Sequence, residues 1–336
     1  MYTKIIFIFQ PIILFLALHI SSSAVNSMRS HSALKVIIDT DLDSDVDDAG
    51  ALAMLYNLHR WGEIELVGVI VTSDDPYAPV CAAALNTYYG LSDIPAGFLK
   101  NQENLKNHSR YTKQIAEEFS SGLESWKDAE DALDLYRKIL AKHADESLVV
   151  VTIGHLSSLQ GLLQSGPDKI SALNGKELAH KKIKNWICMG GQYPAGKEAN
   201  FYRPDPGSTI YCLNNWDKEV VLCGWELGNQ IITGGDWLKQ KLASGHPVYR
   251  GYELYNGFSG RQSWDQTAIL QLTKKADRFF SFVRGNCIVA PDGSNIWEDD
   301  PSGNHRYVVL NSAVDADSVK IFTDHLMAGD MSVMKQ

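Results

Sequence analysis

Residues 36–52 of the chain read Val-Ile-Ile-Asp-Thr-Asp-Leu-Asp-Ser-Asp-Val-Asp-Asp-Ala-Gly-Ala-Leu, and this stretch decides which fold is expected. Six aspartates fall within ten residues, at positions 39, 41, 43, 45, 47 and 48. Ionised carboxylates this close repel one another and raise one another's pKa, so the cluster needs a strong counter-charge. A hard divalent cation such as Ca²⁺, which binds oxygen ligands, supplies that charge.

The residues around the acidic run predict a strand before it and a helix after it. Residues 36–38 are apolar and β-branched, whereas apolar side chains recur at helical spacing between positions 49 and 56. The carboxylates therefore follow the carboxyl end of a strand, which is where open α/β sheets place their ligand sites.

Three kinds of structure besides a cation site contain acidic runs of this sort. A solvated acidic loop does not suit an apolar strand before it and an apolar helix after it. An EF-hand loop has Gly at its sixth position and Glu at its twelfth, but counting from Asp39 gives Ser44 and Gly50. An exported phosphatase of the haloacid-dehalogenase type, with Asp39 as nucleophile and Asp41 as acid, stays open as the alternative enzyme.

Charge and the amino terminus limit the partners that the chain can have. The net charge of −9 argues against nucleic-acid or anionic-membrane partners. Lys4 precedes an apolar stretch over residues 5–20, and small residues follow at 21–24. This pattern predicts a signal peptide over residues 1–24 and an exported protein, periplasmic or extracellular, with no membrane attachment after cleavage. A retained membrane anchor is the alternative.

The five cysteines do not indicate a disulfide framework. Cys188 and Cys223 lie in apolar strand-like runs, and Cys81 lies in an alanine-rich helical stretch. We expect buried free thiols that act as small apolar residues.

Strand-like and helical segments alternate along the rest of the chain. Strands are predicted at residues 66–71, 148–153, 183–189 and 220–223, and helices at 81–85, 133–140, 157–163 and 263–272. Asp128 is expected to cap the second of these helices. Residues 101–125 show no clear helical or strand period and could form a cover over a site. Beyond residue 275 the sequence shows no clear pattern of strands or helices. The alternation predicts one α/β domain over residues 33–330, with a mostly parallel sheet and helices on both faces.

Five segments in this order resemble the nucleoside hydrolases of the inosine–uridine-preferring superfamily. The opening Asp39-Thr40-Asp41 with Asp47-Asp48 is similar to the family's first motif. The later segments are Asp74 with residues 86–90, residues 152–156, Met189-Gly190-Gly191 followed by Glu198-Ala199-Asn200, and Trp264-Asp265. The resemblance spans residues 35–272 and implies a divergent, exported member with its site at the carboxyl ends of the strands.

The resemblance also implies a role for individual residues. A Ca²⁺ ion would be held by Asp41, Asp48, Asp265 and the backbone carbonyl of Ile153. The sugar of the substrate would be bound by Asp47, Asn200, Glu198 and Asp74. Stacking of Trp264 on the base is our own hypothesis, separate from the resemblance.

The chain departs from the family pattern at two places. Two additional residues separate the carboxylate pairs of the first motif, so an ungapped alignment would replace Asp41 with Asp43. We prefer Asp41, because it keeps the strand end in register. Trp264 stands where several members have a His beside the leaving base, which leaves the leaving-group acid unassigned. Candidates for that role are Tyr252, Tyr255, Arg261 and His246.

Together these observations predict a Ca²⁺-dependent hydrolase that cleaves the N-ribosidic bond of nucleosides or of a related N-glycoside. Asp41 would activate the attacking water. A non-catalytic ribose- or nucleoside-binding protein is a further alternative. The base, the sugar and the formation of a homo-oligomer are left open by the sequence.

Overall fold

The computed structural model describes residues 33–100 and 105–335. The predicted signal peptide over residues 1–24 lies outside these residues. In the described part of the chain, no helix combines the length and the apolar character needed to span a bilayer.

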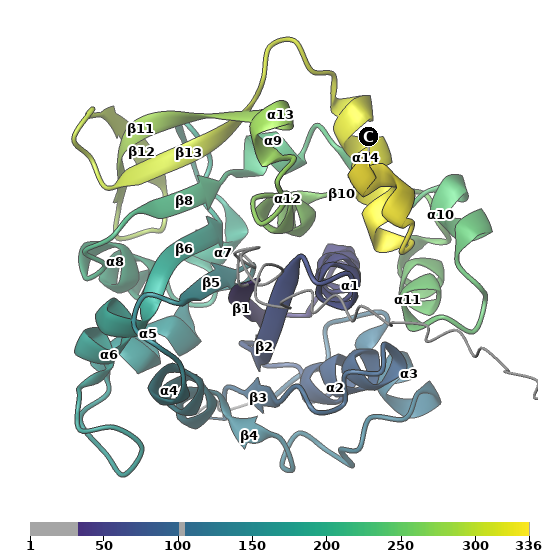
Figure 1. Ribbon diagram of the computed structural model, residues 1–336, viewed down its shortest axis with the longest axis horizontal. Coiled ribbons are helices and arrows are strands. Elements are labelled where there is room, and N and C mark those ends of the chain that lie inside the picture. Colours follow the sequence, from purple (N-terminus) through teal and green to yellow (C-terminus); the bar gives the residue numbers. More distant parts are fainter. Residues whose placement is uncertain (1–32, 101–104, 336) are drawn as a thin grey trace, which may run out of the picture. The chain divides into compact units, whose positions relative to one another are not determined.

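Strand β1 (Leu34–Thr40), which precedes the acidic run, lies inside a large sheet (Figure 1). It pairs in parallel with β2 (Ile64–Val71) on one side and with β5 (Leu148–Thr152) on the other. The strand order among the described residues is β4-β3-β2-β1-β5-β6-β8-β13-β11-β12-β7. The other strands are β3 (Ala96–Phe98), β4 (Glu130–Asp131), β6 (Ile183–Met189), β7 (Ala195–Gly196), β8 (Val220–Cys223), β11 (Phe280–Val289), β12 (Asn295–Asp299) and β13 (His305–Leu310).

Neighbouring strands are parallel from β4 to β13, whereas the pairs of β13 with β11, β11 with β12 and β12 with β7 are antiparallel. The prediction of a mostly parallel sheet is therefore confirmed. The antiparallel end comes mainly from the part of the chain beyond residue 275, where the sequence showed no clear pattern.

Apolar side chains of β1 point to both faces of the sheet, so both faces must be covered. Val36 and Ile38 pack into one hydrophobic cluster, and Ile37 packs into the other. Figure 1 shows the helices on the two sides. The helices of the first cluster are α1 (Asp47–Arg60), α2 (Ala78–Tyr88), α3 (Thr112–Glu118), α9 (Trp225–Gly228), α10 (Asp236–Lys241), α11 (Pro247–Asn256), α12 (Trp264–Leu270), α13 (Ala276–Phe279) and α14 (Ala316–Met327). Those of the second are α4 (Ala132–Lys142), α5 (Ser157–Gln164), α6 (Gly175–Lys182), α7 (Ala199–Tyr202) and α8 (Pro206–Asn214).

Two smaller elements complete the described chain. Strands β9 (Ile232–Thr233) and β10 (Arg261–Gln262) form an antiparallel pair outside the main sheet. A 3₁₀ helix (Met331–Lys335) follows α14. All five cysteines are buried and free, as the sequence predicted.

Two local features differ from what the sequence led us to expect. The segment between residues 105 and 125 is not uniformly irregular, because α3 forms within it and buries Ile115 against the core. The prediction that Asp128 caps α4 is wrong. That helix begins only after β4, so its cap is Asp131, whose Oδ1 accepts hydrogen bonds from the Leu133 amide at 2.9 Å and the Asp134 amide at 3.3 Å.

The cap of α4 can be tested by paired substitutions. Asp131→Ala should lower the free energy of unfolding in urea by about 1 kcal/mol, because it leaves helix amides without an acceptor. Asp128→Ala should cost less, because the Asp128 carboxylate accepts from the amide and hydroxyl of Ser125 in an exposed turn and not from helix amides. A larger loss for Asp128→Ala would show that the capping assignment is wrong.

Candidate active site

A cavity of about 770 Å³ lies where several parallel strands end. It is lined by residues from the loops that follow β1, β2 and β5, and by the last residue of β6. All of the residues predicted to bind the metal or the substrate line this one cavity, namely Asp41, Asp47, Asp48, Asp74, Ile153, Glu198, Asn200, Trp264 and Asp265.

The ends of β1 and β5 are tied together beneath the cavity. The Ile153 amide donates to the Asp39 carbonyl at 2.7 Å. Gly154 lies so close to Asp41 that a Cβ at position 154 would come within 2.7 Å of the Asp41 amide nitrogen. The absence of a side chain at Gly154 therefore allows the Asp41 backbone to pass at this point.

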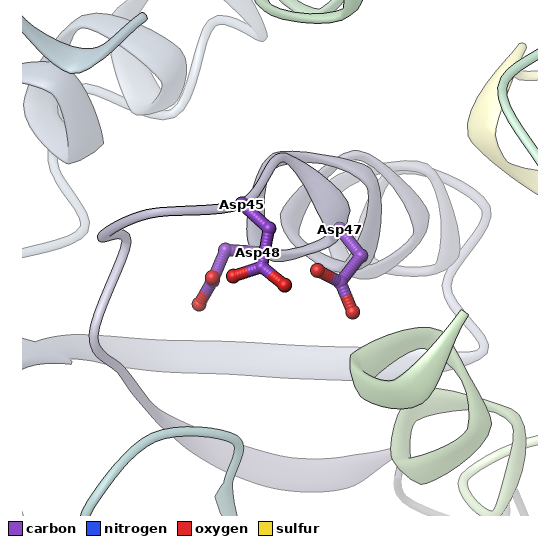
Figure 2. A group of neighbouring side chains, drawn as sticks. All are labelled: Asp45, Asp47 and Asp48. Atoms are coloured by element: carbon purple, nitrogen blue, oxygen red, sulfur yellow. The ribbon is translucent and has the colours of Figure 1, made fainter. Parts of the chain in front are cut away.

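Carboxylates gather at the first turn of α1 (Figure 2). Oxygens of Asp45, Asp47 and Asp48 lie within 4.8 Å of one another, and the three side chains point to the same side of the helix start. The Asp48 Oδ1 accepts from the Thr40 hydroxyl at 2.5 Å and the Leu42 amide at 3.1 Å. These donors fix one carboxylate at the end of β1.

Asp265 joins this cluster from α12, far away in the sequence. Its backbone amide donates to Asp47 Oδ2 at 3.2 Å. Burial raises the pKa of the Asp265 carboxyl well above its usual value, and the charges of Asp47 and Asp48 raise it further. The start of α12 and the β1 loop thus contribute to the same electrostatic site.

Burial is also the largest cause of the raised pKa values within the β1 loop. It raises the pKa of Asp41 and Asp47 well above the usual range, with repulsion from neighbouring carboxylates adding to it. The pKa of Asp48 rises to about 7, although the Thr40 hydroxyl opposes the rise. Buried carboxylates that repel one another are strongly favoured in their ionised form by a bound cation.

The donor set fits a hard divalent cation, because carboxylate and carbonyl oxygens are the ligands that Ca²⁺ and Mg²⁺ prefer. Of the predicted ligands, only Asp48 belongs to the close group that includes Asp45 and Asp47. Asp41 lies near the group, since the charge of Asp48 adds to the rise of the Asp41 pKa. No role was predicted for Asp45, although this residue lies in the acidic run and belongs to the group.

Asp45 also connects the acidic loop to the far wall of the cavity. Its Oδ2 lies 2.5 Å from Arg261 Nη2. The Arg261 guanidinium lies 4.6 Å from the Trp264 ring centroid and 5.6 Å from that of Tyr255. The loop after β1, which has two more residues than the family pattern, therefore reaches the residues expected at the leaving base.

Arg261 is the one leaving-group candidate of the four that lines the cavity. Tyr252 is fully buried, and its hydroxyl contacts the Met327 sulfur at 3.6 Å. His246 caps α11 and packs edge-on against Tyr88. Tyr255 contacts Arg261 from outside the cavity lining. These three side chains therefore do not reach the cavity wall, because they take part in packing around α11.

His108, His155 and Trp225 also line the cavity and were not identified as site residues from the sequence. His108 Nε2 lies 3.1 Å from Asp74 Oδ2. His155 follows β5, and burial lowers the pKa of its ring to about 4. Trp225 lies near Trp264, with ring centroids 6.5 Å apart and planes 26° apart. Only His155 could have been found from the sequence, because it lies within a matched segment.

Asp39, the nucleophile of the phosphatase alternative, is not at the cavity. It is 1% exposed and accepts hydrogen bonds from the Thr72 hydroxyl and, at 2.8 Å, the Tyr136 hydroxyl. A carboxylate enclosed in this way cannot attack a substrate, so the structure argues against that alternative.

Comparison with known proteins gives a family for the sequence. The model of the family described as inosine-uridine preferring nucleoside hydrolase matches residues 36–319. The comparison with curated proteins gives no match.

Solved structures show the same fold at low sequence identity. A plant nucleoside hydrolase, PpNRh1, is similar with a TM-score of 0.64 and 18% identity, over 88% of this chain and 99% of that one. An inosine-uridine preferring nucleoside hydrolase from Bacillus anthracis has the same TM-score and identity, over 90% and 99% of the two chains. The type III effector XopQ, solved with adenosine diphosphate ribose, has a TM-score of 0.63 and 14% identity, over 91% and 96%.

The close approach of Gly154 to Asp41 can be tested by adding one methyl group. Gly154→Ala should displace Asp41 and lower whatever turnover the cavity supports by at least about tenfold, while circular dichroism shows a folded protein. Gly161→Ala is the matched control, because a Cβ there meets nothing within 4 Å. Full activity in Gly154→Ala would show that the position of Asp41 is unimportant.

Proposed function

The chain belongs to the inosine-uridine preferring nucleoside hydrolase family and is a hydrolase of N-glycosyl bonds; on this premise we propose that it cleaves nucleosides or a related N-glycoside with a bound Ca²⁺ and a water activated by Asp41. One observation carries the proposal: Asp41, Asp48 and Asp265, from segments far apart in the chain, line a single cavity. Polar residues suited to a sugar, Glu198 and Asn200, line the same cavity.

Cleavage of an N-ribosidic bond develops positive charge on the sugar and negative charge on the departing base. A bound divalent cation would supply a water of lowered pKa at this site. In the proposal, Asp41 accepts the proton of the attacking water, and the surrounding carboxylates stabilise the positive charge on the sugar. Asp47 and Asn200 orient the ribose hydroxyls.

The segment that carries Glu198 and Asn200 is well suited to hold a sugar in one position. Glu198 Oε2 accepts from the Gly191 amide at 3.0 Å, and its Oε1 accepts from the Asn200 amide at 2.8 Å. The Asn200 side chain donates to the Ile153 carbonyl at 3.2 Å. These bonds connect the sugar contacts directly to the strand ends beneath them, and a site held in this way keeps its substrate in the reactive geometry.

The base is proposed to bind beside Trp264. Trp264 and Trp225 offer two aromatic rings on one side of the cavity, and the Trp264 indole nitrogen donates to the Trp225 carbonyl at 3.0 Å. This hydrogen bond fixes the Trp264 ring for stacking.

A nucleoside panel assayed for reducing-sugar release, with and without chelator, tests reaction class and cation together. We expect release that a chelator abolishes and that added Ca²⁺ restores. Sugar release that resists the chelator would show that the reaction needs no divalent cation. Release of phosphate from phosphomonoesters, with no release of sugar from nucleosides, would show that the proposed reaction class is wrong.

Paired substitutions identify the carboxylate that activates water. Asp41→Asn should lower kcat by about 10²- to 10⁴-fold, because the neutral amide cannot accept the proton. Asp43→Asn, in the same loop and on the same cavity wall, should retain most of the turnover. The reverse order of the two losses would transfer the role to Asp43.

We also propose that the chain is exported, from the charge and apolar pattern of residues 4–24. Amino-terminal sequencing of the secreted or periplasmic protein should begin after about residue 24. A full-length protein found only in the cytoplasmic fraction would contradict export.

A further inference from the structure

We propose that the cavity contains an anion subsite on its sugar side, formed by Lys197 and Arg203, and that the substrate carries a phosphate group on the sugar. The identity of the bond that is cleaved rests on the proposed function. The binding of an anion at this subsite does not depend on that function. The inference narrows the substrate class from neutral nucleosides to nucleotides or other 5′-phosphorylated ribosyl compounds.

Both cations belong to the segment that carries the proposed sugar contacts. Lys197 directly precedes Glu198, and Arg203 directly follows α7, which begins after Glu198. Lys197 Nζ and Arg203 Cζ each lie 5.1 Å from the centroid of the Tyr202 ring. All three side chains line the cavity. The aromatic ring thus holds two positive groups at one edge of the site.

These cations are poorly neutralised by the protein itself. Lys197 pairs with Asp292 at 3.2 Å, but the two side chains are 45% and 61% exposed, so the pair contributes little. Within residues 33–100 and 105–335, no carboxylate lies at ion-pair distance from Arg203. By contrast, Arg261, the other arginine of the cavity, is paired with Asp45.

A positive edge is unexpected in a chain of net charge −9 whose cavity is lined by many aspartates. A neutral nucleoside would leave the exposed Arg203 guanidinium solvated by water alone. A phosphate group would accept two parallel hydrogen bonds from the guanidinium and a further one from the Lys197 ammonium, which could exchange Asp292 for it.

The neighbourhood of Lys197 and Arg203 to the proposed sugar contacts Glu198 and Asn200 in the chain favours the 5′ carbon of the sugar as the position of the anion. The aromatic pair Trp225 and Trp264 is proposed for the base, which is attached at C1′. The C5′ group is attached at C4′, across the ring oxygen from C1′. With the ring held by Glu198 and Asn200, a 5′-phosphate extends toward the adjoining Lys197 and Arg203.

The phosphate is recognised but not transferred. Water adds hydroxide to C1′, the bond between C1′ and the base nitrogen breaks, and the proton goes to the base. A nucleoside 5′-monophosphate and water therefore become free base and ribose 5-phosphate, with no change in oxidation state.

The specificity test compares inosine 5′-monophosphate with inosine. We expect wild-type kcat/KM to be at least about tenfold higher for the phosphorylated compound, and Arg203→Gln to lower that ratio about tenfold. Lys197→Gln should lower it by less, because Lys197 is shared with Asp292. Lys169→Gln, an exposed charge change outside the cavity, is the matched control and should leave the ratio unchanged.

A binding test separates this inference from the reaction class. By calorimetry, the Ca²⁺-loaded protein should bind ribose 5-phosphate at least about tenfold more tightly than ribose, with a preference that weakens as salt increases and is lost in Arg203→Gln. Such binding without cleavage of any nucleoside or nucleotide would refute the proposed function and retain the subsite. Equal binding of ribose and ribose 5-phosphate, or an unchanged preference in Arg203→Gln, would overturn the subsite.

Discussion

The mutual repulsion of buried carboxylates at the end of β1 is the constraint on which the rest of the site depends. A chain can hold Asp41, Asp47, Asp48 and Asp265 together only if donors and a counter-charge offset the repulsion. The Thr40 hydroxyl and the amides of Leu42 and Asp265 are such donors, and they offset part of the repulsion. The remaining negative charge is what makes a divalent cation the natural occupant.

The fold keeps this unfavourable group in place because β1 is anchored in the sheet on both sides. Parallel pairing with β2 and β5 buries Val36, Ile37 and Ile38 in two hydrophobic clusters. The stability of these clusters allows the strand end to carry polar groups that would not be stable in a small or exposed element. Function is therefore concentrated at one edge of the sheet, as is general for open α/β folds.

The cavity has three chemically distinct regions that suit different parts of one molecule. Carboxylates gather at the strand ends. The aromatic rings of Trp225 and Trp264 form a second group, and the cations Lys197 and Arg203 at Tyr202 form a third. Such a division gives orientation as well as affinity, because each region rejects the groups that another accepts.

Sequence patterns predicted the local elements and the residues that follow them, but they predicted contacts between distant segments less well. The assignment of Asp128 as a helix cap was wrong because the short strand β4 comes before the helix, whose cap is Asp131. The antiparallel strands beyond residue 275 were missed because their exposed and buried residues do not alternate cleanly. The family resemblance, not periodicity, brought Asp265 and Asn200 into the predicted site.

The sequence by itself determined the strand, acidic loop and helix at residues 36–52, because apolar periodicity and charge density are local properties. Only the tertiary structure decided that Asp45 pairs with Arg261, that Asp39 is enclosed, and that Lys197 and Arg203 share one aromatic ring. These facts depend on side-chain packing and on how crossovers bring remote segments together, which no local pattern encodes.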